Sequence, residues 1–104
     1  MVVYNVIVTP ASATSLSVSW TSYGERIVGY QVDYQLTSKD QCGPGGNREH
    51  YGSPVTGHSK VLTGLFAFST YTVYVTPIYI GNTKCTVVER SQSGTTNEAG
   101  RYMY

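Results

Sequence analysis

The sequence has little charge of either sign and no long apolar run. Charged residues make up 12% of the 104 residues, and the formal net charge is +1. A protein that neutralises a nucleic-acid backbone needs a concentrated basic patch, and these charges are dispersed along the chain. A membrane-spanning helix needs roughly twenty consecutive apolar residues, which no segment approaches. We therefore expect neither a nucleic-acid partner nor membrane insertion.

Motifs for catalysis and metal binding are also missing. The six acidic residues are scattered, and no nucleophile-elbow or metal-ligand spacing occurs. His50 and His58 are the only histidines, and no thiolate or carboxylate pattern lies beside them in sequence, so both are expected on the surface. The glycine-rich segment from Gly43 to Asn47 lacks the lysine and following helix of a phosphate loop. We predict a protein that is not an enzyme and holds no cofactor or metal.

Tyrosine is the residue in excess, with ten copies, and Ser, Thr, Val and Gly are also common. β-Branched and aromatic side chains suit a pleated, half-buried strand, whereas long helix-forming residues are scarce here. No stretch shows the helical period, and no internal repeat occurs. A chain of this length fits one domain with a core of its own. The composition therefore favours a single all-β domain.

Short alternating runs separated by turn residues support this class. In the run from Thr14 to Trp20, Leu16, Val18 and Trp20 alternate with serines, which predicts a strand with one buried face. The other expected strands are Tyr4 to Thr9, Ile27 to Leu36, Arg48 to Tyr51, Ser59 to Leu62, Thr70 to Thr76 and Lys84 to Ser91.

Two segments are expected to interrupt regular pairing. Pro77 has no N–H to donate to a central strand pair, so pairing should end or bulge there. The segment from Thr37 to Gly57 is the least strand-like, and Gly43 to Asn47 within it is a strong turn signal. Connections of this length are usually functional or mobile. We interpret it as either a mobile surface hairpin or a recognition loop.

Several segments together resemble the fibronectin type III family, over residues 5 to 96. The resemblance implies a seven-stranded immunoglobulin-like β-sandwich of two antiparallel sheets, with the domain over residues 1–96 and an exit segment over 97–104. The matching pieces are Pro10, Ser15 to Trp20, Ile27 to Tyr34, Leu62 to Leu65, Thr70 to Val75 and Thr95-Thr96.

The resemblance also assigns structural roles. Trp20 should fill the core between the sheets, and Tyr71 matches the tyrosine-corner position, whose hydroxyl bonds backbone near Leu65. Ala67 and Ser69 stand where the family usually has proline and threonine, so the loop before the sixth strand should be somewhat looser. The expected core residues are Trp20, Tyr71, Leu62, Leu65, Val32 and Val73.

The two cysteines, Cys42 and Cys85, form a candidate disulfide, because an even count in a secreted module favours pairing. The bridge would close a loop of about forty residues and contribute roughly 4 kcal/mol in the chain-entropy interpretation. It requires Cα atoms within about 7 Å, and the third strand runs away from the Gly81-Asn82 turn. The cysteines can therefore meet only if the long segment folds back across the sheet; otherwise the thiols are free or externally paired.

Tyrosines also predict a protein-binding surface. Tyr74 should face outward from the sheet that shows Gln31 and Asp33, and other tyrosines fall in loops at one end of the sandwich. Tyrosine-rich surfaces are favoured at protein interfaces, although such rings also simply cover the edge of a core. The candidate binding residues are Tyr74, Tyr23, Tyr79, Ile80, Gln31 and Asp33.

The resemblance implies an extracellular module of a receptor or cell-adhesion protein, standing in tandem with neighbours and monomeric in isolation. It would act as a spacer and protein-binding domain. Two alternatives stay open: an accessory module of a secreted microbial enzyme, and an intracellular muscle-type tandem module with reduced thiols. The short Gly81-Asn82 turn argues against an engineered binder. No Arg-Gly-Asp tripeptide and no N-glycosylation sequon occurs.

Overall fold

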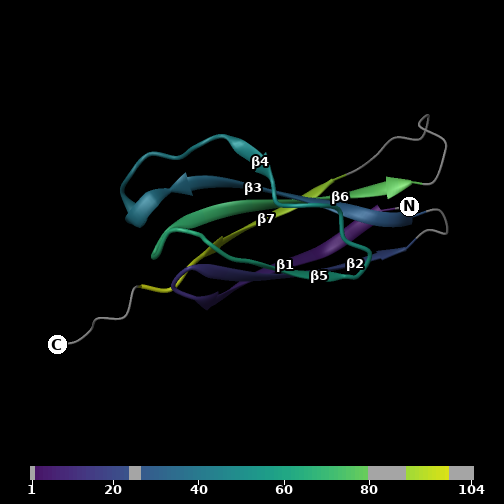
Figure 1. Cartoon of the computed structure of the whole chain (residues 1–104), viewed down its shortest axis with the longest axis horizontal. Helices are drawn as coiled ribbons and strands as arrows, with labels where there is room; N and C mark the ends of the chain where they lie inside the picture. The colour runs from purple at the N-terminus through teal and green to yellow at the C-terminus, as the bar shows by residue number, and fades with distance from the viewer. Residues whose placement is uncertain (1, 24–26, 80–88, 99–104) are drawn as a thin grey trace.

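The computed structural model describes residues 2–23, 27–79 and 89–98, with the side chains of residues 2–4, 23 and 79 left out. These residues form two antiparallel sheets packed face to face (Figure 1), which confirms the predicted β-sandwich. No helix within this part of the chain is long and apolar enough to cross a membrane. The strands are β1 (Val2–Ser12), β2 (Ser15–Tyr23), β3 (Ile27–Ser38), β4 (Arg48–His50), β5 (Ser59–Leu62), β6 (Thr70–Tyr79) and β7 (Arg90–Thr95).

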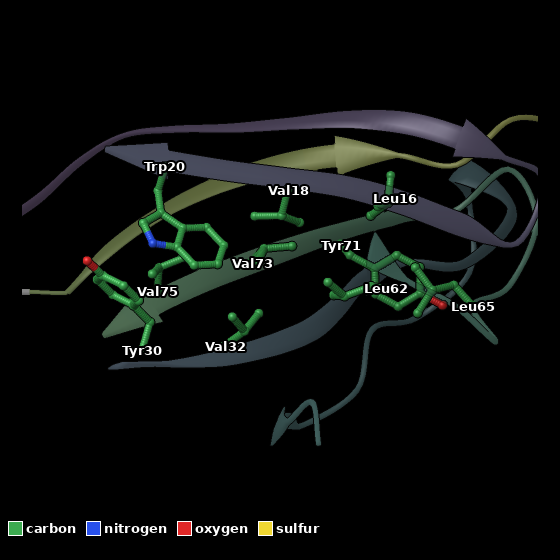
Figure 2. Close-up of a cluster of buried hydrophobic side chains, with 10 residues drawn as sticks. All are labelled: Leu16, Val18, Trp20, Tyr30, Val32, Leu62, Leu65, Tyr71, Val73 and Val75. Atoms are coloured by element: carbon green, nitrogen blue, oxygen red, sulfur yellow. The ribbon is translucent and has the colours of Figure 1, made fainter. Parts of the chain in front are cut away.

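The sheets have three and four strands. The smaller sheet has the order β1-β2-β5 and the larger has the order β4-β3-β6-β7. Each sheet turns one face inward, so the period-two alternation in the sequence separates core residues from surface residues. The core consists of Leu16, Val18, Trp20, Tyr30, Val32, Leu62, Leu65, Tyr71, Val73 and Val75 (Figure 2). All six residues expected in the core from the sequence lie in it.

Trp20 anchors one end of this core. Its ring meets Tyr30 in an edge-to-face arrangement, with centroids 5.3 Å apart. The indole Nε1 is buried and has no hydrogen-bond partner among the described residues. Figure 2 shows this nitrogen on the side of the indole that faces Tyr30.

Tyr71 anchors the other end as a tyrosine corner. Its hydroxyl oxygen accepts a hydrogen bond from the Phe66 backbone N–H at 2.8 Å, one residue after the expected position. The loop before β6 is held further by Ser69, whose hydroxyl donates to the Ala67 carbonyl at 2.8 Å and accepts the Asp40 N–H at 3.0 Å. Ser69 is fully buried. The serine therefore supplies local bonds in the loop that was expected to be looser.

β6 continues through Pro77, where the sequence suggested an interruption. The reason lies in β3, because the Tyr30 N–H and C=O bond the backbone of Val55, at 2.8 and 2.9 Å, rather than β6. Pro77 pairs with Tyr30, so its nitrogen faces away from β3 and toward β7, whose pairing with β6 ends at Val75 and Arg90 within the described residues. The expected irregularity appears just beyond it, as a register shift between Ile27 and Gly29.

The long segment after β3 is a hairpin that packs onto the sandwich. A 3₁₀ turn, η1 (Lys39–Gln41), lies within a loop that is closed where the Gly46 N–H donates to the Leu36 carbonyl at 2.7 Å. A Cβ at Gly45 would lie 2.5 Å from that same carbonyl, so the loop requires glycine there. The chain then forms β4 and crosses to the other sheet, where Tyr51 Oη bonds Thr63.

Candidate protein-interaction face

The outer face of the four-stranded sheet carries rows of polar side chains that span all four strands. Cross-strand pairing places His50, Asp33, Tyr74 and Ser91 in one row, running from β4 to β7. Neighbouring residues in such rows are close enough for their side chains to interact. The row beside it contains Arg48, Gln35, Thr72 and Ser93. Gln31 and Thr76 form a pair on the other side of it.

Arg48 lies across this face from β4 toward the start of β7. Its Nε donates to Asp33 Oδ2 at 3.0 Å, and its two terminal nitrogens donate to the carboxylate of Glu89 at 3.1 and 2.7 Å. Its Cζ also stands 3.9 Å from the centre of the Tyr74 ring. Stacking and a bidentate carboxylate contact are the two interactions for which a planar guanidinium is best suited. Arg48 therefore covers one face of the Tyr74 ring. Its contacts with Asp33 and Glu89 fix the orientation of its guanidinium group.

Asp33 is the buried charge beneath this cover. The residue is 6% exposed. A buried carboxylate is costly unless it is paired, and Asp33 has two partners. Besides Arg48, Asp33 contacts His50, with His50 Nδ1 lying 2.5 Å from Asp33 Oδ1. His50 is 74% exposed, so the pairing ties an otherwise solvent-facing side chain of β4 to β3.

The pKa values of the long-range pair shift in opposite directions. The hydrogen bond from Arg48 lowers the pKa of Glu89, against the smaller opposing effect of burial. The hydrogen bond to Glu89 raises the pKa of Arg48, again opposed by burial and aided by Asp33. Both groups therefore carry their charges at neutral pH, which maintains the contact across the sheet.

Tyr74 is also fixed at its hydroxyl. This group donates to Gln35 Oε1 at 3.1 Å, while Gln35 Nε2 donates to the Gly46 carbonyl at 3.0 Å. The β3–β4 turn is thus linked through Gln35 to the centre of the sheet. Beside these residues lies an open depression of about 350 Å³, lined by Asp33, Arg48, Glu49 and His50. A rigid tyrosine and arginine beside a depression suit recognition of another protein.

The residues described here offer no cluster of three or more side chains suited to a metal ion. The structure brings together three of the predicted binding residues, Tyr74, Asp33 and Gln31. Asp33 and Tyr74 are cross-strand partners, and Gln31 is the next outward residue on β3. The side chains of Tyr23 and Tyr79, and all of Ile80, lie outside the described residues.

Arg48 and Glu89 were not singled out from the sequence. They are 41 residues apart, and no local pattern connects them. The predicted edge strand at Arg48 to Tyr51 was the available signal, because its alternate side chains had to share a face with Asp33. His50 was expected on the surface, where it does lie, but its carboxylate partner is 17 residues away in sequence.

His58 belongs to a separate cluster at the end of the sandwich near Trp20. Its Nε2 lies 3.2 Å from the Tyr30 hydroxyl, which also bonds Ser22. The backbone N–H of Trp20 donates to the His58 backbone carbonyl at 3.0 Å. This cluster links the two sheets, and among the described residues the side-chain partners of His58 are the hydroxyls of Tyr30 and Ser22.

Cys42 is exposed and lies next to η1, at the end of the sandwich where β6 begins. Its N–H bonds the Lys39 carbonyl at 3.1 Å. Cys85, the predicted partner, lies outside the described residues. The predicted bridge therefore stays a prediction.

Comparisons with known proteins agree with this architecture. The family model described as "Fibronectin type III domain" matches residues 2–95. A computer-redesigned β-sandwich protein is 19% identical, with a TM-score of 0.71, over 100% of this chain and 97% of that chain. The fn3 domain of human collagen alpha-1(XX) is 24% identical, with a TM-score of 0.65, over 96% and 89%. The fn3 domain of human contactin 1 is 18% identical, with a TM-score of 0.64, over 100% and 83%. No curated protein matches the sequence.

Proposed function

Because the chain belongs to the fibronectin type III family, whose domains are generally non-catalytic interaction modules, we propose that it is an extracellular module of a multidomain receptor or cell-adhesion protein. In this proposal it sets the spacing between neighbouring modules and binds a protein partner. The outer face of the four-stranded sheet is the binding surface, with Tyr74 and Arg48 at its centre.

The observation that supports this surface is the rigid pairing of Tyr74 with Arg48. Tyrosine and arginine are enriched among residues that dominate protein-binding energy. Here the tyrosine is fixed by Gln35 and the arginine by Asp33 and Glu89, so little side-chain freedom is lost on binding. Threonine and serine hydroxyls surround the pair and provide a polar rim of the kind that encloses such centres.

Two of the similar structures support the extracellular assignment by analogy. They are domains of a collagen chain and of contactin 1, and tandem modules of chicken contactin 1 are also similar, with a TM-score of 0.68. At identities of 18 to 24%, this similarity shows the shared fold. The cellular compartment of this chain is therefore a question for experiment.

Alkylation followed by intact-mass measurement tests the compartment. Cysteines that resist alkylation until they are reduced would support a disulfide and an oxidising compartment. Immediate reaction of both thiols would favour the intracellular tandem module, for which the exposed Cys42 is the relevant observation.

Binding to an array of secreted receptor ectodomains tests the surface. We expect Tyr74→Ala to abolish a partner signal that the wild-type domain gives, with the domain still folded. Ile7→Ala is the matched control, because Ile7 is an apolar side chain, 54% exposed, on the three-stranded sheet. Equal loss in both variants, or no loss in Tyr74→Ala, would remove the outer face from the proposal.

A further inference from the structure

The depression beside Tyr74 is lined by one buried residue and three exposed ones. Asp33 of β3 is 6% exposed, whereas the three residues of β4 all lie at the surface. The Asp33 carboxylate is therefore the deepest group of the lining. Its two oxygens have different partners, since Oδ2 accepts a hydrogen bond from Arg48 Nε at 3.0 Å and Oδ1 lies 2.5 Å from His50 Nδ1. A group that enters the depression can reach the carboxylate only where one of these partners leaves it.

The two partners of Asp33 are held to very different degrees. Arg48 also donates two hydrogen bonds to Glu89 and stacks on the Tyr74 ring, so its departure would break several contacts at once. The His50 side chain is 74% exposed, and among the described residues Asp33 is its one hydrogen-bond partner. Rotation of the imidazole into solvent breaks that single contact and uncovers Asp33 Oδ1. His50 is therefore the partner that can be displaced.

Negative charge predominates around the depression. Three carboxylates stand beside one guanidinium, which gives the group a net charge of −2 while His50 is neutral. The carboxylates belong to Asp33, Glu49 and Glu89, and the guanidinium belongs to Arg48. This sign is opposite to that of the whole chain, whose formal net charge is +1. Arg48 is shared by two of the carboxylates, and within the described residues Glu49 has no ion pair. The excess charge is complementary to a cationic partner.

The other cations in the described part of the chain lie away from this face. Lys60 and Arg90 pair with residues of the buried core, so they belong to the inward rows of β5 and β7. Lys39 lies in η1, with Nζ 4.2 Å from the centre of the Phe66 ring. None of these three residues is placed to balance the carboxylates of the outer face.

We propose that the depression accepts a lysine or arginine side chain of the protein partner, which displaces His50 from Asp33 Oδ1. This inference rests on the proposed function, because it names the group that the outer face binds. The incoming cation donates to Oδ1 in place of the imidazole, and Glu49 offers a second carboxylate in the same lining. A hydrogen bond from a cation to a carboxylate is stronger than one from a neutral donor, so the exchange is favourable. Arg48 keeps its position over Tyr74.

The exchange makes binding depend on the charge of His50. Histidine is the side chain whose charge ordinarily changes near physiological pH. A protonated His50 makes a charge-assisted hydrogen bond to Asp33 and also repels the incoming cation. The charged groups around His50 are Asp33 on β3, Arg48 and Glu49 on its own strand, and Glu89, which is linked through Arg48. Acidification should therefore weaken the binding of a cation.

Titration of this chain with N-acetylarginine amide tests the site directly. N-acetylcitrulline amide is the matched control probe, because its urea group resembles the guanidinium in shape but carries no charge. We expect the arginine probe to shift the NMR signals of Asp33, Glu49 and His50, with an affinity about tenfold higher than that of the citrulline probe. Equal affinities, or shifts that do not include these residues, would overturn the proposal.

Substitutions at the two members of the displaced contact should act in opposite directions. His50→Ala removes the competitor, so it should tighten binding of the arginine probe about threefold at pH 7.5. Asp33→Asn should weaken it about tenfold, with Trp20 fluorescence as the check on folding. Glu49→Gln changes an exposed residue and should weaken it about twofold in a domain of unchanged stability. Weaker binding by His50→Ala would mean that His50 holds the cation rather than competing with it, and the proposal would be wrong.

The pH profile separates displacement of His50 from general attraction to an acidic surface. Between pH 7.5 and 5.5 the affinity of wild-type protein for the arginine probe should fall about threefold or more, and that of His50→Ala should stay nearly constant. Parallel profiles would contradict the proposal.

Competition on the array of receptor ectodomains distinguishes this inference from the proposed function. Excess arginine probe should release a partner whose signal depends on Tyr74, and the citrulline probe should not. A Tyr74-dependent signal that resists the arginine probe would overturn this inference and leave the proposed function standing. Specific binding of the arginine probe without any partner on the array would support the cation site and count against the proposed function.

Discussion

The two faces of the four-stranded sheet are built from alternate residues of the same strands, yet they are organised in different ways. The inner face of β3 and β6 carries Val32, Val73 and Val75, which are almost completely buried. The outer face carries Asp33 and Tyr74, which are covered by a single arginine from an edge strand. One face is stabilised by removing apolar area from water, the other by a few directional contacts.

This difference has consequences for stability and for function. Apolar burial is non-directional, and its loss leaves a cavity that neighbouring groups fill only in part. Contacts on the outer face compete with water, so each one contributes much less to folding. The outer face can therefore change its side chains without unfolding the domain, which is what a binding surface requires.

The largest expected effect comes from the apolar side. Trp20→Ala should lower the free energy of unfolding by about 3–5 kcal/mol, because it truncates a large buried ring that packs on Tyr30. Urea denaturation followed by circular dichroism measures the change. A loss below about 1 kcal/mol would mean that Trp20 does not support the core as its burial indicates.

Tyr71→Phe is expected to cost about 1–3 kcal/mol. The ring stays in the core, but the Phe66 N–H loses its acceptor in a partly buried place. Tyr51→Phe is a matched control, since its hydroxyl bonds Thr63 at an exposed site where water can replace it. Equal denaturation midpoints for wild type and Tyr71→Phe would argue against a stabilising tyrosine corner.

Arg48→Ala tests the outer face, with an expected cost of about 1–2 kcal/mol, since the buried Asp33 carboxylate loses its arginine partner. Glu89→Ala, which leaves only a more exposed arginine unpaired, should cost less than about 1 kcal/mol. If Arg48→Ala destabilised the domain as much as Trp20→Ala, the distinction between the two faces would fail.

The residues of the buried inner face could be predicted from the sequence, because the alternation of apolar and polar residues that marks them is local. Alternation in Leu16, Val18 and Trp20 identifies a buried face without knowledge of the neighbours. The same reasoning placed Tyr74 and Asp33 outward, on one sheet.

The position of Arg48 over the outer face could not be predicted from the sequence, because it depends on the order of the strands in the sheet. Arg48 reaches Glu89 only because β3 and β6 lie between β4 and β7, and no spacing in the sequence specifies this. Pro77 shows the same limit: whether its missing N–H matters depends on where Tyr30 directs its own backbone groups. Pattern therefore predicts which face a residue is on, and tertiary pairing determines what it meets there.

The smallest expected effect is a pH dependence of the outer-face ion pair. The hydrogen bond from Arg48 lowers the pKa of Glu89 below its usual value of 4.5. A carboxyl whose pKa is lower in the folded state stabilises the fold above its unfolded pKa, and this contribution disappears as pH falls through the folded pKa. The difference in unfolding free energy between wild type and Glu89→Gln should thus be constant at neutral pH and shrink below about pH 4.5.

Its magnitude should stay well under about 1 kcal/mol, because Arg48 and Glu89 are both substantially exposed and water screens their attraction. Added salt should reduce it further. The same titration on Trp20→Ala, a change in the apolar core, should show an unchanged pH profile at lower overall stability. A pH-dependent difference that grew on acidification would mean that Glu89 is more stable protonated in the folded state. The contact across the sheet would then not be the ion pair that holds Arg48 over Tyr74.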